Sequence, residues 1–142
     1  MPTVVGISHV ALTVTDLGRA RRFWSEFMGL QVLDSNDNYC ALLTRSPTSS
    51  VVILTTHESV AADTFTEFSV GLDHLSLEVT DVGALTEWRH HLDAHSVPHD
   101  YRRSEWGHHV NLRDPDNIAI ELVVLEPDED VQAILGNNVP MV

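Results

Sequence analysis

The stretch HVALTVTDLG at residues 9–18 decides the fold, because a near copy of it, HLSLEVTDVG, occurs at residues 74–83. The two stretches are offset by 65 residues and are identical at six of ten positions. The opening histidine is shared, so His9 in the first copy corresponds to His74 in the second. Self-similarity at a fixed offset indicates a duplicated structural unit. The sequence therefore predicts two modules built on one plan.

Each copy predicts a strand followed by a helix. Apolar residues alternate with other residues through both stretches, as in a half-buried strand. Both end at an aspartate, Asp16 or Asp81, which is a suitable residue to cap the helix that follows. Three strand-like runs come after each helix, at about 30–34, 39–44 and 50–56 in the first copy and at about 97–101, 106–113 and 117–125 in the second. The predicted organisation is βαβββ, twice, in the α+β class.

The length of 142 residues is enough for one domain and too short for two independent ones. We expect a single domain over residues 1–142, with module one at about 5–56 and a linker at about 57–71. Module two is expected at about 72–125 and an acidic tail at 126–142.

Composition excludes several classes of function. A formal net charge of −13 repels phosphate backbones and anionic membranes, so neither nucleic acid nor a membrane is an expected partner. All eight basic residues are arginine, which excludes a Schiff-base lysine and a P-loop lysine. The single cysteine, Cys40, cannot form an intrachain disulfide. With no long apolar span and no visible secretory signal, this indicates a cytoplasmic protein.

Three candidate metal ligands lie on strand faces turned away from the predicted helices. Successive residues of a strand face opposite sides. The apolar residues of HVALTV face the helix, so His9 faces away, and the same holds for His74. In NIAIELVV (117–124) the alternation turns Glu121 away from the helix as well. Two imidazoles and one carboxylate that leave positions open form a known ligand set for a divalent metal. Such a site suits a small-molecule substrate with two neighbouring oxygens.

These features resemble the vicinal oxygen chelate superfamily, which includes glyoxalase I, extradiol dioxygenases, fosfomycin-resistance enzymes, methylmalonyl-CoA epimerase and the bleomycin-resistance proteins. The matching pieces are ISHVALTVTDLGRARRFWSEFMGLQV, LDHLSLEVTDV and WGHHVNLRDPDNIAIELV. The resemblance implies an eight-stranded, cup-like open barrel made from two βαβββ modules, and a homodimer. It also implies metal ligands at His9, His74 and Glu121, with Ile53 at the remaining ligand position of the family.

The resemblance leaves several functions open. Ile53 can be neither ligand nor base, which departs from the pattern of glyoxalase I and the epimerase. A three-ligand set resembles the extradiol dioxygenases and the fosfomycin-resistance enzymes, although Asn111 stands where both usually have a tyrosine. We therefore favour extradiol-type dioxygenase chemistry on Fe²⁺. A glyoxalase-type lyase or isomerase and a metal-free protein that binds an antibiotic are the alternatives. Mn²⁺, Ni²⁺, Co²⁺ and Zn²⁺ also accept this ligand set.

Four further residues are candidates for the site. Alternation places His109 and Asn111 on the ligand side of their strand. His109 is a candidate proton-transfer group, or else a polar lining residue. Trp106 forms either an aromatic wall at the mouth of the site or a rim or dimer contact. Tyr39 lines the cup if the parity of its strand turns it inward. Together with Ile53, the residues Asn111, Trp106 and Tyr39 are the predicted substrate contacts.

Overall fold

The computed structural model describes residues 1–45, 49–60, 64–126 and 133. The chain divides into two compact units, and each is described by itself. Unit 1 comprises Met1–Phe65 and Asp114–Asn117, and unit 2 comprises Thr66–Arg113 and Ile118–Val142. Residues 127–132 and 134–142 of the predicted acidic tail lie outside the described part of the chain. The expectation of a single domain stays a prediction.

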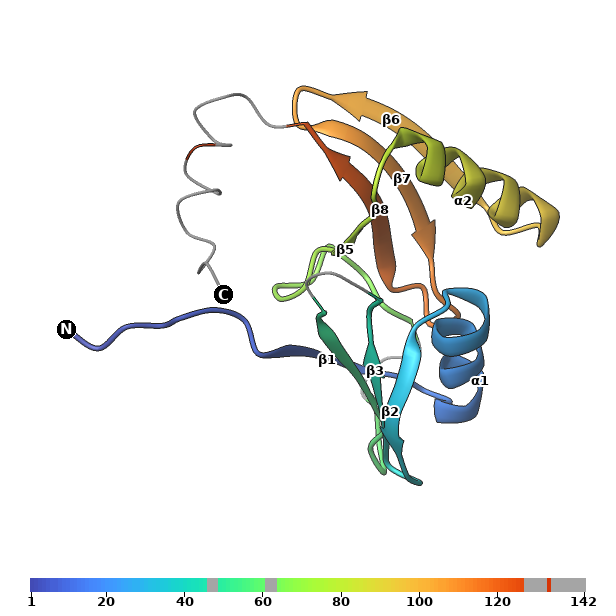
Figure 1. Cartoon of the computed structure of the whole chain (residues 1–142). Helices are drawn as coiled ribbons and strands as arrows, with labels where there is room; N and C mark the ends of the chain where they lie inside the picture. Colours follow the sequence, from blue (N-terminus) through green and yellow to red (C-terminus); the bar gives the residue numbers. More distant parts are fainter. Residues whose placement is uncertain (46–48, 61–63, 127–132, 134–142) are drawn as a thin grey trace. The chain divides into compact units, whose positions relative to one another are not determined.

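Unit 1 is a four-stranded mixed sheet with one helical segment. Its elements are β1 (His9–Thr13), α1 (Leu17–Arg21), η1 (Arg22–Phe27), β2 (Gln31–Ser35), β3 (Tyr39–Leu43) and β4 (Val51–Thr55) (Figure 1). The strand order is β1-β4-β3-β2. β1 runs parallel to β4, and the other neighbours are antiparallel.

Unit 2 repeats this plan. Its elements are β5 (Leu75–Glu78), α2 (Val82–Ala94), β6 (His99–Ser104), β7 (Gly107–Arg113) and β8 (Ala119–Leu125). The order is β5-β8-β7-β6, with β5 parallel to β8. The shared order confirms the two predicted βαβββ modules and the α+β class. The described strands form two open four-stranded sheets rather than one closed barrel.

The helices begin at the two predicted aspartates. The side chain of Asp16 accepts a hydrogen bond from the backbone N–H of Arg19 at 2.9 Å, and that of Asp81 accepts one from Ala84 at 2.8 Å. Both aspartates have extended backbone and satisfy an N–H that the first helical turn leaves free.

Two elements differ from the prediction. The first helix continues as the π-helical segment η1, after which the Met28 N–H donates to the carbonyl of Phe23, five residues earlier, at 2.8 Å. The apolar spacing of the sequence carries no signal for this change. β6 begins and ends later than predicted, because residues up to Val97 still bond to the end of α2. Its antiparallel pairing with β7 then extends to Ser104.

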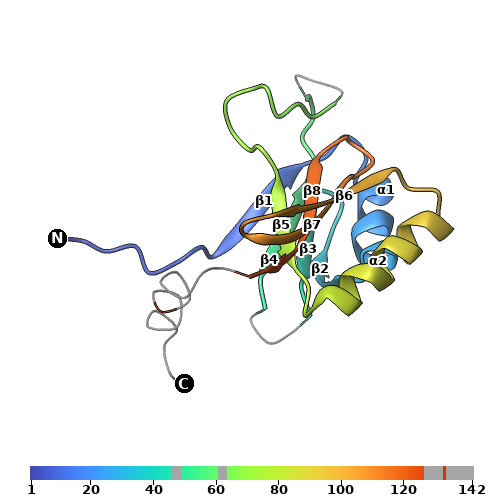
Figure 2. The same ribbon diagram turned by 90° about the horizontal axis from the view of Figure 1, so that it is seen from above.

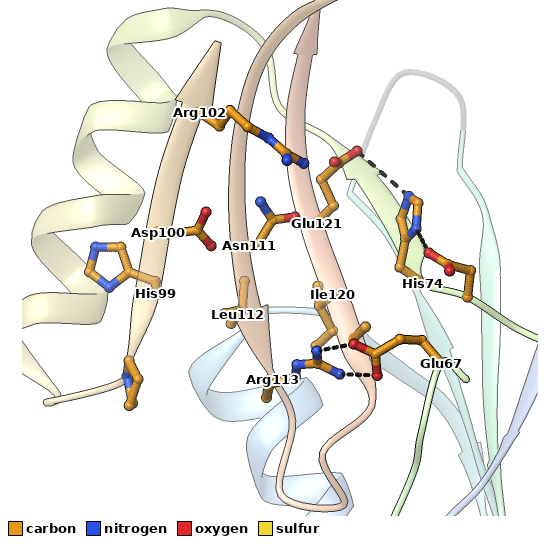
Figure 3. A pocket seen from close by; sticks show the side chains of 13 residues that line it. Glu67, His74, His99, Asp100, Arg102, Asn111, Leu112, Arg113, Ile120 and Glu121 are labelled. Carbon is orange, nitrogen blue, oxygen red and sulfur yellow. Dashed lines mark hydrogen bonds and ion pairs between the residues drawn. The ribbon is translucent and has the colours of Figure 1, made fainter. Parts of the chain in front are cut away.

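Each sheet buries its apolar face against its own helix. In unit 2, α2 lies along one face of the sheet (Figure 1, Figure 2) and packs on β7 and β8. Leu85 and Leu92 of α2 are buried. The sheet contributes the buried residues Val110, Leu112, Ile120 and Leu122. The other face carries polar side chains, among them those of Asp100, Asn111 and Glu121 (Figure 3).

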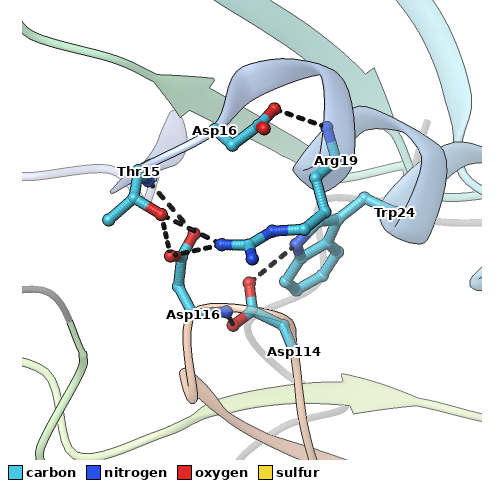
Figure 4. Close-up of polar contacts among 6 residues, drawn as sticks. All are labelled: Thr15, Asp16, Arg19, Trp24, Asp114 and Asp116. Carbon is cyan, nitrogen blue, oxygen red and sulfur yellow. Dashed lines mark hydrogen bonds and ion pairs between the residues drawn. The ribbon is translucent and has the colours of Figure 1, made fainter.

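The turn between β7 and β8 belongs to unit 1 and is held there by two buried aspartates (Figure 4). Asp116 accepts hydrogen bonds from the backbone N–H of Thr15 at 3.2 Å and from the Thr15 hydroxyl. It also pairs with the guanidinium of Arg19 at 3.2 Å. Asp114 accepts from the indole N–H of Trp24 at 3.2 Å and from the N–H of Asp116 at 2.8 Å. These partners offset the cost of burying the two carboxylates.

Replacing Asp114 by asparagine should destabilise the fold. Both oxygens of Asp114 accept hydrogen bonds, and an amide offers only one acceptor, so one buried N–H donor loses its partner. We expect the free energy of unfolding to fall by about 1–3 kcal/mol, measured by urea denaturation. The control is Asp37→Asn, since Asp37 is exposed between β2 and β3. Equal stability of the two variants would contradict the assignment.

Candidate metal and substrate site

The polar face of the unit 2 sheet brings together two of the three predicted metal ligands. The parallel register of β5 and β8 places Ser76 directly opposite Glu121, and the Ser76 hydroxyl donates a hydrogen bond to Oε1 of this carboxylate. His74 immediately precedes β5, and its Nε2 lies 4.0 Å from the same oxygen (Figure 3). The third predicted ligand, His9, is the first residue of β1 in unit 1.

The other ring nitrogen of His74, Nδ1, is hydrogen-bonded to a neighbouring aspartate. Its Nδ1 lies 2.6 Å from Oδ1 of Asp73, which favours the tautomer with the proton on Nδ1. Nε2 then offers its lone pair on the side of Glu121. A carboxylate on the second nitrogen is typical of histidines that bind a metal. In unit 1 the Nδ1 of His9 lies 3.1 Å from the hydroxyl of Ser8, so the residue before each repeated histidine contacts the same nitrogen.

His109 contacts Glu121 from the neighbouring strand. Its Nδ1 lies 3.0 Å from Oε2 of Glu121, an ion-pair distance in a direction that forms no hydrogen bond. Its Nε2 is hydrogen-bonded to the hydroxyl of Ser104 at 2.7 Å. The side chains of His109 and Glu121 are only 11% and 12% exposed, so the contact is largely shielded from water. His109 is therefore placed to orient the carboxylate of Glu121.

A pocket of about 500 Å³ opens in front of these residues (Figure 3). It is lined by Glu67, Asp73, His74, Pro98, His99, Asp100, Arg102, Asn111, Leu112, Arg113, Ala119, Ile120 and Glu121. A bidentate ion pair between Arg113 and Glu67 fixes one wall of the pocket, with N–O distances of 2.6 and 3.1 Å. The hydrogen bonds from Arg113 lower the pKa of Glu67 from its ordinary value of 4.5 to about 2. The pairing raises the pKa of Arg113.

The donors present fit a divalent ion only in part within unit 2. The imidazole and the carboxylate are suitable ligand types, and Nε2 of His74 is available. Within the described part of the chain, no group of three or more His, Cys, Asp or Glu side chains is arranged to hold a metal ion. His74 and Glu121 thus bring two suitable ligand types together, and a site for a divalent ion would need at least one ligand more.

The structure places the predicted substrate contacts on both units. Asn111 lines the pocket and lies directly opposite Glu121 in the β7–β8 register. In unit 1, Ile53 lies opposite Ala11 in the register of β1 and β4, which is the position that Glu121 has opposite Ser76 in unit 2. Ile53 is therefore the counterpart of Glu121 in the duplicated module.

Tyr39 and Trp106 are the other two predicted substrate contacts. Tyr39 begins β3 in unit 1, and its hydroxyl donates a hydrogen bond to Asp34 at 2.5 Å, which raises the pKa of Tyr39. Trp106 lies in the turn between β6 and β7, is 50% exposed and is absent from the lining of the pocket just described.

The sequence reasoning missed three residues that contact predicted site residues. Asp73 holds His74, Ser76 bonds Glu121, and Ser104 bonds His109. The sequence does contain a signal for Asp73. When the repeat is extended by one residue toward the N-terminus, Ser8 aligns with Asp73, so a polar residue precedes each repeated histidine. Ser104 had no such signal, because it meets His109 only through the pairing of β6 with β7.

A family model described as the Glyoxalase/Bleomycin resistance protein/Dioxygenase superfamily matches residues 6–122. The chain belongs to this superfamily. No curated protein matches the chain. The family match confirms the resemblance predicted from the repeated histidine motif.

Solved structures of superfamily members share the fold. The glyoxylase/bleomycin resistance protein/dioxygenase domain from Frankia sp. EAN1pec is 28% identical, with a TM-score of 0.75 over 87% of this chain and 100% of that one. Lactoylglutathione lyase from Agrobacterium tumefaciens is 23% identical, with a TM-score of 0.66 over 83% and 92% of the two chains. The fosfomycin resistance protein FosX from Listeria monocytogenes is 18% identical, with a TM-score of 0.68 over 87% and 94%.

The helices of the described residues give no candidate for a membrane span, since none of them is both long and apolar enough.

The Glu67–Arg113 ion pair should make the stability of the fold depend on pH in the acidic range. The pKa of Glu67 is lower in the folded protein than in the unfolded chain, so its contribution is present above about pH 4.5 and is lost as the pH falls toward 2. We expect Glu67→Gln to lower the melting temperature at pH 7, with the difference from the wild type shrinking between pH 5 and pH 2. Glu87→Gln, at an exposed position on α2, is the control. A difference that does not change with pH would contradict this role.

Proposed function

We propose that this protein is a divalent-metal enzyme acting on a small substrate that carries two adjacent oxygens. The observation that carries the proposal is the arrangement of His74 and Glu121, in which Nε2 of His74 lies 4.0 Å from the carboxylate while Asp73 holds the other nitrogen. A bound divalent ion would supply Lewis acidity to the substrate oxygens. His9, whose Nδ1 lies 3.1 Å from the hydroxyl of Ser8, is the proposed third ligand.

Within this reaction class we favour extradiol-type dioxygenase chemistry on Fe²⁺. The support is the number of ligands: Ile53 takes the place of Glu121 in the register of unit 1, so the duplicated module offers no second carboxylate there. Three protein ligands leave coordination positions for both substrate oxygens. A glyoxalase-type lyase or isomerase is the second candidate, and its support is the superfamily itself rather than the side chain at position 53.

The residues around the ligands have proposed roles of their own. His109 positions Glu121 through its 3.0 Å contact, and from the same place it is the proposed proton-transfer group. Asn111, opposite Glu121 on the pocket face, is a proposed substrate contact. A homodimer, with Trp106 as an exposed aromatic contact, remains our expectation for the assembly.

The proposal is tested by elemental analysis of protein purified without an affinity tag. We expect one equivalent of metal in the wild type and its loss in His9→Ala, His74→Ala and Glu121→Ala, because each variant removes one of three ligands. His90→Ala and Glu87→Ala are matched controls, since both positions are exposed on α2. One equivalent of Fe would support the dioxygenase, and Ni, Zn or Mn would favour the lyase or isomerase.

The competing function is a metal-free protein that binds a small molecule, such as a cationic antibiotic suited to the charge of −13. Absence of bound metal in the wild type, even after reconstitution with each of these ions, would reject the enzyme and favour this alternative. Loss of metal in His74→Ala and Glu121→Ala but not in His9→Ala would reject His9 alone as the third ligand.

Asp73 should tune the affinity for metal without being a ligand. It holds Nδ1 of His74 at 2.6 Å, so Asp73→Asn leaves the ligands in place and weakens the orientation of the ring. Loss of such a partner typically weakens metal binding by about 10–100-fold. Competition with a chelator of known affinity measures the change, with Asp37→Asn as control. An unchanged affinity would show that Asp73 plays no part in the site.

A further inference from the structure

The side chain of Arg102, on the pocket face of unit 2, differs from most of the other charged groups there in its lack of a partner among the described residues. Arg102 lies on β6 and lines the pocket, and its guanidinium extends from β6 across β7 toward Glu121 (Figure 3). It is an exposed residue, and its guanidinium has no ion pair or hydrogen bond with any residue that the structure describes. Its neighbour in sequence, Arg103, faces the other side of the sheet and pairs with Glu126 at 3.5 Å.

Most of the other charged side chains that line the pocket form ion pairs or hydrogen bonds within the protein. Arg113 is bound to Glu67 through two N–O contacts, and Asp73 holds His74. Glu121 accepts from Ser76 and contacts His109. Asp100 is the exception, since it lines the pocket two residues before Arg102 without an ion pair to it. Among the described residues that line the pocket, Arg102 is thus the arginine whose guanidinium is available to a ligand.

A second donor lies on the neighbouring strand β7, where Asn111 is opposite Asp100 in the β6–β7 register. Asn111 is adjacent to Glu121 in the β7–β8 register, and its amide faces the same pocket (Figure 3). Guanidinium and amide N–H groups are donors, and a carboxylate accepts on both oxygens, often from two guanidinium nitrogens at once. A ligand with its chelating oxygens at His74 and Glu121 would present its far end to this cluster of donors on β6 and β7.

We propose that Arg102, assisted by Asn111, binds a carboxylate on the substrate, so that the substrate is a small organic acid that also carries two adjacent oxygens. The inference rests on the proposed function, because it takes the His74–Glu121 end of the pocket as the place where the two oxygens bind. It makes Arg102 a specificity-determining residue. The carboxylate selects acids over neutral compounds with the same chelating group, in a protein whose overall charge of −13 otherwise repels anions.

The test compares two probes that differ only by a carboxylate: catechol and 3,4-dihydroxybenzoate. Each is titrated under argon into the full chain loaded with Fe²⁺, and the affinity is measured by calorimetry. We expect the wild type to bind 3,4-dihydroxybenzoate more tightly than catechol. Arg102→Gln should weaken binding of 3,4-dihydroxybenzoate by about tenfold, the usual scale for a charge-assisted contact at a partly open site, and leave catechol unchanged.

Two variants serve as controls. Arg103→Gln makes the same chemical change on the same strand but on the opposite face, and should leave both affinities unchanged. Asp100→Asn removes the negative charge nearest to Arg102 along the strand and should strengthen binding of 3,4-dihydroxybenzoate. Opposite effects at positions 100 and 102 would follow from charge and not from a general change in the fold.

The outcomes separate the inference from the proposed function. Equal affinity of Arg102→Gln and wild type for 3,4-dihydroxybenzoate, with catechol still bound, would overturn the role of Arg102 and leave the metal site standing. A wild-type protein that binds catechol as tightly as 3,4-dihydroxybenzoate would also overturn it. Failure of metal-loaded wild type to bind either probe would overturn the proposed function and this inference with it.

Discussion

The parallel pairing of β5 with β8 is the constraint on which the candidate site depends. It sets Ser76 opposite Glu121, and the antiparallel pairing of β7 with β8 then sets Asn111 on the other side of the same carboxylate. Because side chains alternate along a strand, a shift of this register by one residue would turn Glu121 toward α2 and expose Ile120 and Leu122. The apolar face that packs on α2 therefore fixes which polar residues meet on the opposite face.

The two units show how one backbone plan can carry different surfaces. In unit 1 the position of Glu121 is taken by Ile53, flanked by Ala11 on β1 and Ala41 on β3. In unit 2 the corresponding flanks are Ser76 and Asn111. The strand order and the parallel pairing of the first strand with the last are the same in both units, so the difference at this position rests on the side chains of one face. The repeated histidine is the polar residue that both modules retain at the start of this face.

The elements that the sequence predicted well are those set by local rules. Alternation identified the strands and their faces, and the capping aspartates Asp16 and Asp81 marked where both helices begin. The π-helical segment and the displaced ends of β6 depend on how the chain packs after the helices, and a pattern of apolar residues does not encode this.

In the candidate site, too, local rules predicted which face a residue lies on, and packing decided its contacts. Alternation placed His109 and Glu121 on one face, since both lie on strands whose period is fixed. Their 3.0 Å contact depends on the stagger of two strands and on side-chain rotamers, which the sequence does not show. The contact of Ser104 with His109 and the position of Arg102 at the pocket likewise depend on the pairing of β6 with β7, which the sequence does not show.

The turn at residues 114–117 has a consequence for synthesis on the ribosome. Trp24 and Arg19 are made early, yet the carboxylates that satisfy them, Asp114 and Asp116, emerge about ninety residues later. Until then the first module lacks the acceptor of the Trp24 indole N–H and the carboxylate that pairs with Arg19, and with them the stability that these contacts supply. A fragment that ends between the two modules would lack this turn, so completion of unit 1 waits for the connection between the last two described strands.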